Sequence, residues 1–114
     1  MPEFIFKNKL YYNPVEFALT FIGGTWKMPI LWRLNQKSQR YSQIKKTLPR
    51  VSDKMLTSQL RELEELGLIS RKVFAEVPPR VEYTITKEGK KAIPIIKKIR
   101  EYGLYLMKQN GIKD

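Results

Sequence analysis

Residues 51–67, Val-Ser-Asp-Lys-Met-Leu-Thr-Ser-Gln-Leu-Arg-Glu-Leu-Glu-Glu-Leu-Gly, constrain the fold most, because they predict one helix with a defined start and end. Ser52 is a suitable N-cap, and Asp53 puts a carboxylate in the first turn, where the helix dipole favours it. Gly67 stands where a left-handed residue commonly ends a helix. Helical periodicity predicts a buried stripe that consists of Met55, Leu56, Leu60, Leu63 and Leu66.

The opposite face of this helix differs between its two halves. The glutamates of residues 62–65 are confined to the second half, and we expect them to point away from phosphate. The first half is small, hydroxylated and basic, which suits entry into a DNA groove; the alternative is a solvated face that merely lacks acids. The candidate DNA-facing side chains here are Lys54, Thr57, Ser58 and Arg61.

Charge and composition narrow the function. The 114 residues carry 22 Lys plus Arg against 11 Asp plus Glu, a net charge of +11. Such an excess in one small domain indicates a polyanionic partner, which is DNA, RNA or an acidic membrane surface; a basic protein without a specific site is the alternative. The chain has no Cys and no His. Disulfides, thiol sensing, Cys/His zinc sites and His-dependent catalysis are thereby excluded, and we expect no cofactor and no metal.

No apolar run approaches the roughly 18 residues needed to span a bilayer, and no secretory signal opens the chain. We therefore expect a soluble cytoplasmic protein that does not engage a membrane.

Three helices are predicted before residue 51. Asn13 is a suitable N-cap for residues 14–22, and Thr25 for residues 25–34. The aromatic arm of residues 1–13 is expected to pack against its own domain or a second subunit. The predicted buried faces of the two helices are Val15, Ala18, Leu19 and Ile22, and Trp26, Ile30, Leu31 and Leu34.

Residues 40–48 predict a third short helix, and the tight turn of residues 49–51 joins it to the next one. Two helices joined in this way form a helix-turn-helix unit, in which the helix of residues 52–66 is the reader. Ser42 lies near the start of the supporting helix, where its hydroxyl and nearby backbone N–H groups can meet a phosphate.

Alternating apolar residues predict a β-hairpin after Gly67, with strands in residues 68–77 and 81–86. Pro78 and Pro79 cannot donate ladder hydrogen bonds and so belong at its tip. A hairpin after a recognition helix is a wing. Arg80 is expected at the wing tip, reaching a phosphate or the minor groove; a solvated turn residue is the alternative.

Residues 86–107 predict one long final helix, which Thr86 caps and Pro94 bends. Its apolar surface exceeds what one small domain usually needs. We interpret the excess as a dimer surface shared with the N-terminal arm, although an intramolecular core is the alternative.

Several of these segments together resemble one family, the HxlR-type winged helix-turn-helix transcriptional regulators. The resemblance covers about residues 13–103 and is carried by Ile-Gly-Gly-Thr-Trp-Lys (22–27), Ser-Asp-Lys-Met-Leu-Thr (52–57), Leu-Arg-Glu-Leu (60–63) and Glu-Val-Pro-Pro-Arg-Val-Glu-Tyr (76–83), followed by Thr86 and Gly89. Many members have a Cys just before the Pro-Val-Glu segment, which some use to sense oxidants or electrophiles. Asn13 occupies that position here, so this route of thiol sensing is closed.

The resemblance implies a mainly α fold with a small β-hairpin (α+β): a single winged helix-turn-helix domain over residues 1–114. Residues 1–22 and 87–108 would contribute to a homodimer interface. The homodimer would bind double-stranded DNA at an inverted-repeat operator, with residues 52–66 in the major groove and the wing, residues 74–83, on the backbone or minor groove. The predicted DNA-binding residues are Lys27, Ser42, Arg50, Ser52, Lys54, Thr57, Ser58, Arg61 and Arg80.

Two other classes of function remain as alternatives. A winged helix can hold a protein or RNA instead of a specific DNA site, and the aromatic arm and apolar final helix would then be the binding surface. An enzyme is disfavoured by the missing Cys and His and by the lack of a Gly-rich phosphate loop or paired acids. A small-molecule effector is possible in principle, but no motif specifies one.

Overall fold

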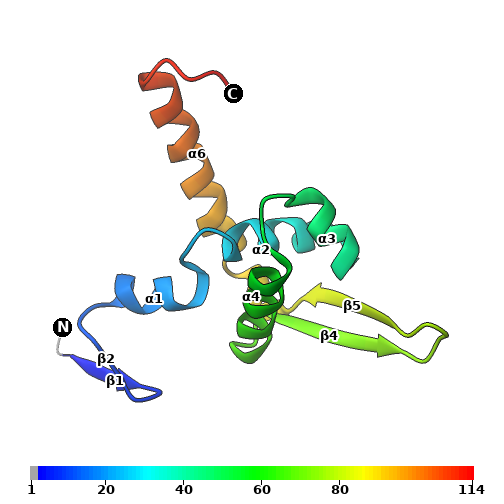
Figure 1. Cartoon of the computed structure of the whole chain (residues 1–114). Coiled ribbons are helices and arrows are strands. Elements are labelled where there is room, and N and C mark those ends of the chain that lie inside the picture. The colour runs from blue at the N-terminus through cyan, green and yellow to red at the C-terminus, as the bar shows by residue number, and fades with distance from the viewer. Residues whose placement is uncertain (1–2) are drawn as a thin grey trace.

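The helix-turn-helix unit and a three-stranded sheet form the body of the computed structural model, which describes residues 3–114 (Figure 1). A separate N-terminal hairpin and α1 lie at one side, and α6 projects away from the body. The elements are β1 (Phe4–Phe6), β2 (Lys9–Tyr11), α1 (Pro14–Ile22), α2 (Lys27–Gln36), β3 (Gln39–Arg40), α3 (Tyr41–Thr47), α4 (Asp53–Glu65), β4 (Ile69–Phe74), β5 (Arg80–Ile85), α5 (Lys87–Lys90) and α6 (Ile93–Gln109). The predicted class, mainly α with a small antiparallel sheet, is confirmed.

Both predicted ends of α4 are confirmed by hydrogen bonds. The Ser52 hydroxyl accepts from the backbone N–H of Met55 at 3.0 Å. At the other end Gly67 has a φ of 79°, and the N–H of Leu68 returns to the carbonyl of Leu63 at 2.9 Å. This is the Schellman arrangement, which satisfies carbonyls that the last turn would otherwise leave open.

The core lies where α2, α3 and α4 meet the sheet. Three residues of the predicted stripe of α4, Leu56, Leu60 and Leu63, are buried, whereas Leu66 is half-buried and Met55 is 43% exposed. Met55 precedes Leu56 and so lies about 100° around the helix axis from it, at the edge of the stripe. The largest fully buried side chains are Ile30, Leu31, Leu34, Ile44, Val51, Leu56, Leu60, Leu63 and Ile69.

The wing consists of β4, β5 and the loop between them. The two strands pair antiparallel from Ile69 opposite Ile85 to Phe74 opposite Arg80. The sheet order is β3-β5-β4, so β5 is central. The sequence did not indicate β3, because two residues are too few to show an alternating pattern.

The N-terminal arm packs on its own chain, as a hairpin that the sequence did not predict. Lys7 and Asn8 form its turn with positive φ angles of 51° and 64°. Its aromatic rings pack against α1 with centroids 5.1 to 6.2 Å apart; the cluster is Phe4, Phe6, Tyr11, Phe17 and Phe21. The first two residues of the predicted arm lie outside the described residues.

The predicted buried face of α1 is therefore largely wrong. Ile22 is buried, but Val15 is 69% exposed and Leu19 is 51% exposed, and Ala18 is exposed as well. The aromatic residues on the other side of α1 meet the hairpin instead, which leaves this apolar face uncovered. The predicted cap of α2 is also wrong: α2 begins at Lys27, one residue later than a Thr25 cap requires.

The final segment is two helices, not one bent helix. Thr86 caps α5 as predicted, its hydroxyl accepting from the Gly89 N–H at 3.0 Å. The helix then breaks at residues 91–92, and Pro94 stands at the second position of α6. In a continuous helix Pro94 would lack its N–H donor, and its ring would press on the carbonyl of Lys90.

The beginning of α6 is anchored in the core through Ile96 and through Ala92, the residue just before the helix. Much of the apolar surface further along α6 is uncovered within one chain: Ile95, Ile99, Tyr102 and Leu106, which form a stripe at helical spacing, are between 40% and 63% exposed. Among residues 3–114, no helix is both long and apolar enough to cross a membrane.

Candidate nucleic-acid interface

The first half of α4 presents the side chains that the sequence singled out. Lys54, Thr57, Ser58 and Arg61 are all exposed. Because α4 packs by its leucine stripe, this face points away from the core. Ser52 is exposed at the N-terminal end of the helix, where the helix dipole is positive.

Side chains from α2 and α3 fix the position of α4. The Tyr41 hydroxyl donates to the Asp53 carboxylate at 2.7 Å, and the Lys45 amino group donates to the Val51 carbonyl. Arg33 holds the end of α3 from α2, donating to the hydroxyl of Thr47 at 2.9 Å. The Tyr41 and Lys45 bonds cross the turn between α3 and α4, and the Arg33 bond ties α3 to α2, so the start of α4 is held in place through α3.

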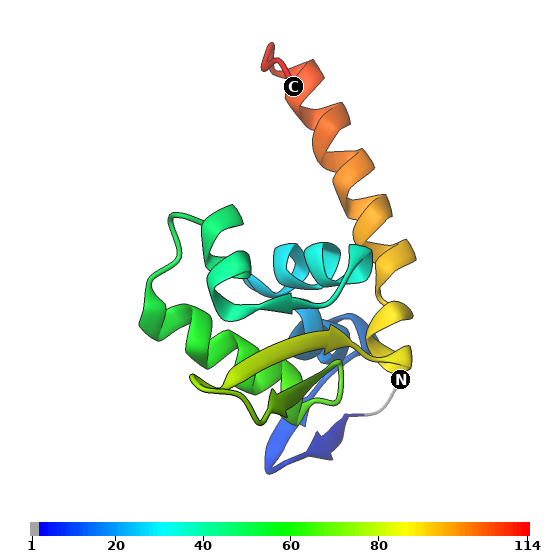
Figure 2. The same ribbon diagram turned by 90° about the vertical axis from the view of Figure 1, so that its right-hand side faces the viewer.

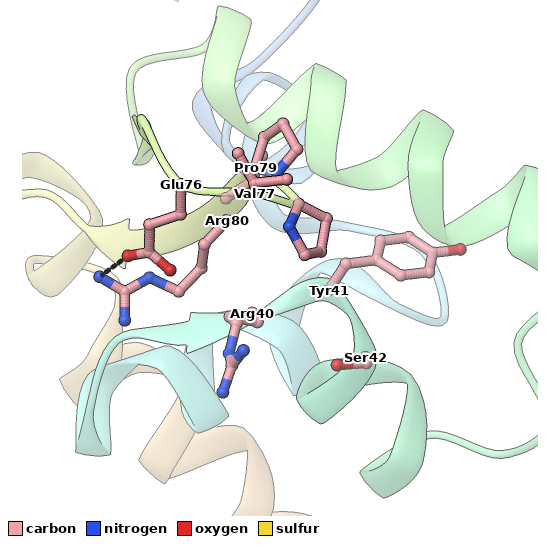
Figure 3. A pocket seen from close by; sticks show the side chains of 9 residues that line it. Arg40, Tyr41, Ser42, Glu76, Val77, Pro79 and Arg80 are labelled. Carbon is pink, nitrogen blue, oxygen red and sulfur yellow. Dashed lines mark ion pairs between the residues drawn. The ribbon is translucent and has the colours of Figure 1, made fainter.

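Ser42 and Arg80 line the same pocket, of about 440 Å³, between the start of α3 and the wing loop (Figure 3). Arg40 and Tyr41 also line it, together with residues 76–81. The structure thus brings two predicted phosphate contacts together, although they are separated in sequence. Arg50 is exposed in the turn before α4.

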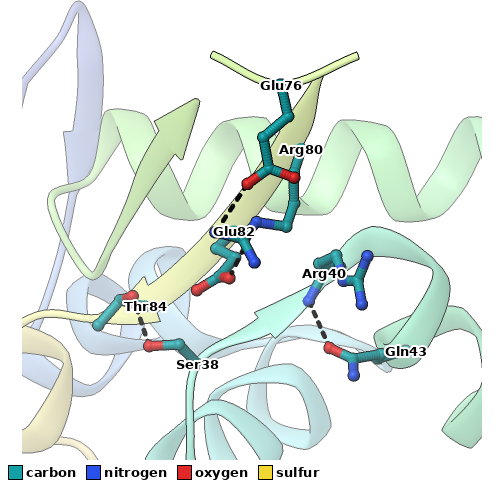
Figure 4. A network of polar contacts seen from close by, with 7 residues as sticks. All are labelled: Ser38, Arg40, Gln43, Glu76, Arg80, Glu82 and Thr84. Atoms are coloured by element: carbon teal, nitrogen blue, oxygen red, sulfur yellow. Dashed lines mark hydrogen bonds and ion pairs between the residues drawn. The ribbon is translucent and has the colours of Figure 1, made fainter. Parts of the chain in front are cut away.

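Arg80 does not project from the wing tip, which corrects its predicted placement. It is the first residue of β5, and its guanidinium lies over the Phe74 ring at 4.1 Å. Two carboxylates hold it, that of Glu76 at 3.2 Å and that of Glu82 at 3.5 Å (Figure 4). Its Nε is buried and makes no hydrogen bond, so the contact with Glu82 is an ion pair only. Strand periodicity explains the arrangement, since Phe74 is the cross-strand neighbour of Arg80 and Glu82 lies two residues along the same face.

Lys27 is paired with a carboxylate of α4. It is only 8% exposed, and its amino group faces the Glu62 carboxylate at 3.6 Å. A buried ammonium needs such a partner, because desolvation without one is costly. Its charge is therefore already paired within the protein, with a carboxylate on α4.

A hollow of about 180 Å³ lies between α4 and the wing, and the sequence did not indicate it. We call it the α4–wing hollow; it is lined by Thr57, Arg61, Glu64, Arg71 and Tyr83. Glu64 is one of the glutamates expected to point away from phosphate; it lines this hollow, and its carboxylate approaches the Arg71 guanidinium at 3.9 Å. The register of the wing would have revealed Arg71, because it stands opposite Tyr83 and so shares its face.

Two tyrosines near the exposed face of α4 stay protonated well above neutral pH. Burial is the main cause that raises the pKa of Tyr83. Burial also raises the pKa of Tyr41, and the hydrogen bond to Asp53 adds to that rise. Both hydroxyls therefore remain hydrogen-bond donors at physiological pH. Within residues 3–114, no three or more His, Cys, Asp or Glu side chains come together as a metal site would need.

Comparison with known proteins places this geometry in a family. Residues 21–111 match the model described as HxlR-like helix-turn-helix. An uncharacterized HTH-type transcriptional regulator of Methanothermobacter thermautotrophicus is 47% identical over 93 residues, covering 82% of this chain and 71% of that protein. The uncharacterized HTH-type transcriptional regulator YybR of Bacillus subtilis is 39% identical over 101 residues, covering 85% and 81%. These relatives are described as regulators of transcription, not as enzymes.

Solved structures agree with the sequence comparison. A putative HTH-type transcriptional regulator, ytcD, superposes with a TM-score of 0.81 at 39% identity, covering 85% of this chain and 99% of that one. The oxidized form of the redox regulator HypR gives 0.78 at 36% identity, covering 90% and 99%. The winged helix-turn-helix architecture is therefore shared over most of the chain.

Proposed function

The chain belongs to the HxlR-like helix-turn-helix family of transcriptional regulators, and from this premise we propose that it binds a specific operator as a homodimer. The operator has approximate two-fold symmetry. The first half of α4 enters the major groove, and the wing lies beside it on the backbone or in the minor groove. The protein acts by binding, and no chemical step is involved.

One observation carries this proposal: a rigidly capped helix presents basic and hydroxyl side chains on a face turned away from the core. Ser58, Thr57 and Arg61 would contact base edges, and Arg61 can pair with the O6 and N7 acceptors of a guanine. Lys54 can reach either a base or a phosphate. Ser42, Arg50 and the N-terminal end of α4 at Ser52 would position the dimer on the backbone.

Arg80 and Lys27 differ from the other predicted DNA-binding residues because each is already paired with a carboxylate. Arg80 lies at the wing but would have to leave Glu76 or Glu82 to bind phosphate, and Lys27 is directed to Glu62. We therefore assign the main phosphate contacts to the exposed residues Ser42, Arg50 and Ser52. Lys27 is left out of the DNA-contacting set.

The uncovered apolar faces support the homodimer. Val15 and Leu19 on α1 and the stripe from Ile95 to Leu106 on α6 are exposed in one chain. Burying them in a symmetric contact would remove an apolar surface that a monomer rarely leaves open. In this proposal residues 1–114 form one DNA-binding domain, and residues 1–22 and 87–108 supply the dimer contact.

The proposal is tested by selecting bound sequences from a random DNA pool. We expect an inverted repeat with half-sites about one helical turn apart. Failure to enrich any motif, together with equal weak binding to all sequences, would refute the proposal and favour a winged helix that holds a protein or RNA.

A point substitution tests the reading face. Arg61→Ala should weaken operator binding and relax sequence preference at one position of each half-site, with a cost of about 1–3 kcal/mol per contact. Lys97→Ala on exposed α6 is the matched control and should leave the selected motif unchanged. Unaltered preference in the Arg61 variant would show that another face reads the DNA.

A further inference from the structure

The α4–wing hollow lies where a DNA backbone strand passes if α4 enters the major groove. The wing strands lie next to α4 in the view of Figure 2, and in Figure 1 they extend away from it toward the wing loop. The hollow opens between residues of α4 and residues of the two strands. A sugar–phosphate strand separates each major groove from the neighbouring minor groove. A helix in one groove and a wing beside it must therefore straddle that strand, which then passes over the hollow.

The chemistry of the hollow suits a phosphate. Arg61 and Arg71 bring two guanidinium groups, each with several N–H donors in a planar fork that matches phosphate oxygens. Thr57 and Tyr83 add hydroxyl groups, and Tyr83 stays protonated because burial raises its pKa. Glu64 is the one carboxylate among the lining residues, so the hollow carries a net positive charge.

We propose that the α4–wing hollow binds one backbone phosphate of the operator, and that Arg71 is its main ligand. This inference rests on the proposed function and adds to it a site and a residue on β4 that the reading face of α4 does not include. Arg61 then has two neighbours in the complex, a base edge on its outer side and the phosphate on its wing side.

In the absence of DNA, Glu64 pairs with Arg71. Its carboxylate lies 3.9 Å from the Arg71 guanidinium, and the two side chains are 41% and 48% exposed. An exposed pair at this distance is weak, so Arg71 can exchange the carboxylate for a phosphate at little cost. The same carboxylate repels the incoming phosphate. Arg71 and Glu64 therefore have opposite effects on affinity, which a purely structural pair would not show.

The first test measures DNA affinity against salt concentration for the full-length protein. Each phosphate neutralised contributes a slope of about 0.9 in log affinity against log salt. Arg71→Gln should lower affinity by about tenfold or more, and it should reduce the magnitude of the slope by about 0.9 per protomer. Arg71→Lys should restore most of the slope but only part of the affinity, because an ammonium lacks the planar fork. Glu64→Gln should raise affinity by about two- to fivefold.

Lys72→Gln is the matched control for charge on the wing. Lys72 neighbours Arg71 on the same strand, but strand alternation turns it to the opposite face, where its amino group lies 4.9 Å from the Phe74 ring. Its loss should change the slope less than the loss of Arg71. An equal change would show that the wing attracts DNA by diffuse charge and would overturn the proposal.

The second test removes the charge from the DNA. In the selected operator, single phosphates are replaced in turn by neutral methylphosphonates. One position per half-site should weaken binding to wild type yet have little further effect on Arg71→Gln. If the effects of the neutral linkage and of Arg71→Gln add independently at every position, Arg71 binds no single phosphate. That result leaves the proposed function intact, whereas failure to select any operator refutes the proposed function itself.

Discussion

Replacing Ser52 by Ala should lower the melting temperature by about 4 °C. Its hydroxyl is the side-chain acceptor for the Met55 N–H at the start of α4, at 3.0 Å. Losing an N-cap of this kind costs about 1 kcal/mol. For 114 residues, an unfolding entropy of about 2.1 cal/mol/K per residue gives roughly 0.24 kcal/mol per degree, from which the 4 °C follows. Ser52 is exposed, so no cavity adds to the loss.

Ser52→Asp separates stability from DNA binding. An aspartate also caps a helix, and its charge suits the positive end of the dipole, so this variant should melt at or above the wild-type temperature. The same charge lies at the end of α4 that we place against phosphate, and DNA affinity should therefore fall.

The assay is thermal unfolding followed by far-ultraviolet circular dichroism, with all variants at one protein concentration because dimerisation shifts the midpoint. DNA affinity is measured well below the midpoint. A Ser52→Ala variant that melts with wild type would show that the cap bond contributes nothing. A Ser52→Asp variant as destabilised as Ser52→Ala would refute the reasoning about the cap.

Three further predictions test other parts of the molecule. Lys27→Met should leave the salt dependence of DNA binding unchanged, since the Lys27 amino group faces Glu62; a reduced slope in binding titrations would place Lys27 on phosphate. Ile99→Asp on α6 should shift the protein toward monomer in light scattering, whereas Lys97→Asp should not; a monomeric wild type would contradict the dimer. Because the raised pKa of Tyr83 favours the neutral phenol in the folded state, unfolding free energy should fall as pH rises above 10.0, and less so in Tyr83→Phe; identical denaturant midpoints over that range would contradict the shift.

Local signals predicted the helix-turn-helix well because they act over a few residues. Ser52 and Gly67 define α4 by hydrogen bonds to their own helix, and Thr86 does the same for α5. Contacts between distant segments were harder to predict. The arm's aromatic residues showed that it would pack, but helical periodicity alone could not tell whether Val15 or Phe17 faced the core.

Charged side chains were the hardest to place, because their partners come from other elements. The net charge of +11 suggests many phosphate contacts, yet the glutamates of α4 and the wing act as internal counterions. They form ion pairs with three of the basic residues, and these three differ in how exposed their side chains are. Side-chain exposure is 11% for Lys27, 32% for Arg80 and 48% for Arg71.

This order ranks the cost of exchanging a carboxylate for a phosphate. Arg71 has the longest and most exposed pair, so it exchanges most easily. Arg80 must give up two carboxylates and its position over Phe74, and Lys27 would have to leave the protein interior. Substituting each by Gln should therefore lower the salt slope of DNA binding most for Arg71, less for Arg80 and not for Lys27. The reverse order would show that net charge, and not pairing within the fold, decides which basic residues meet the DNA.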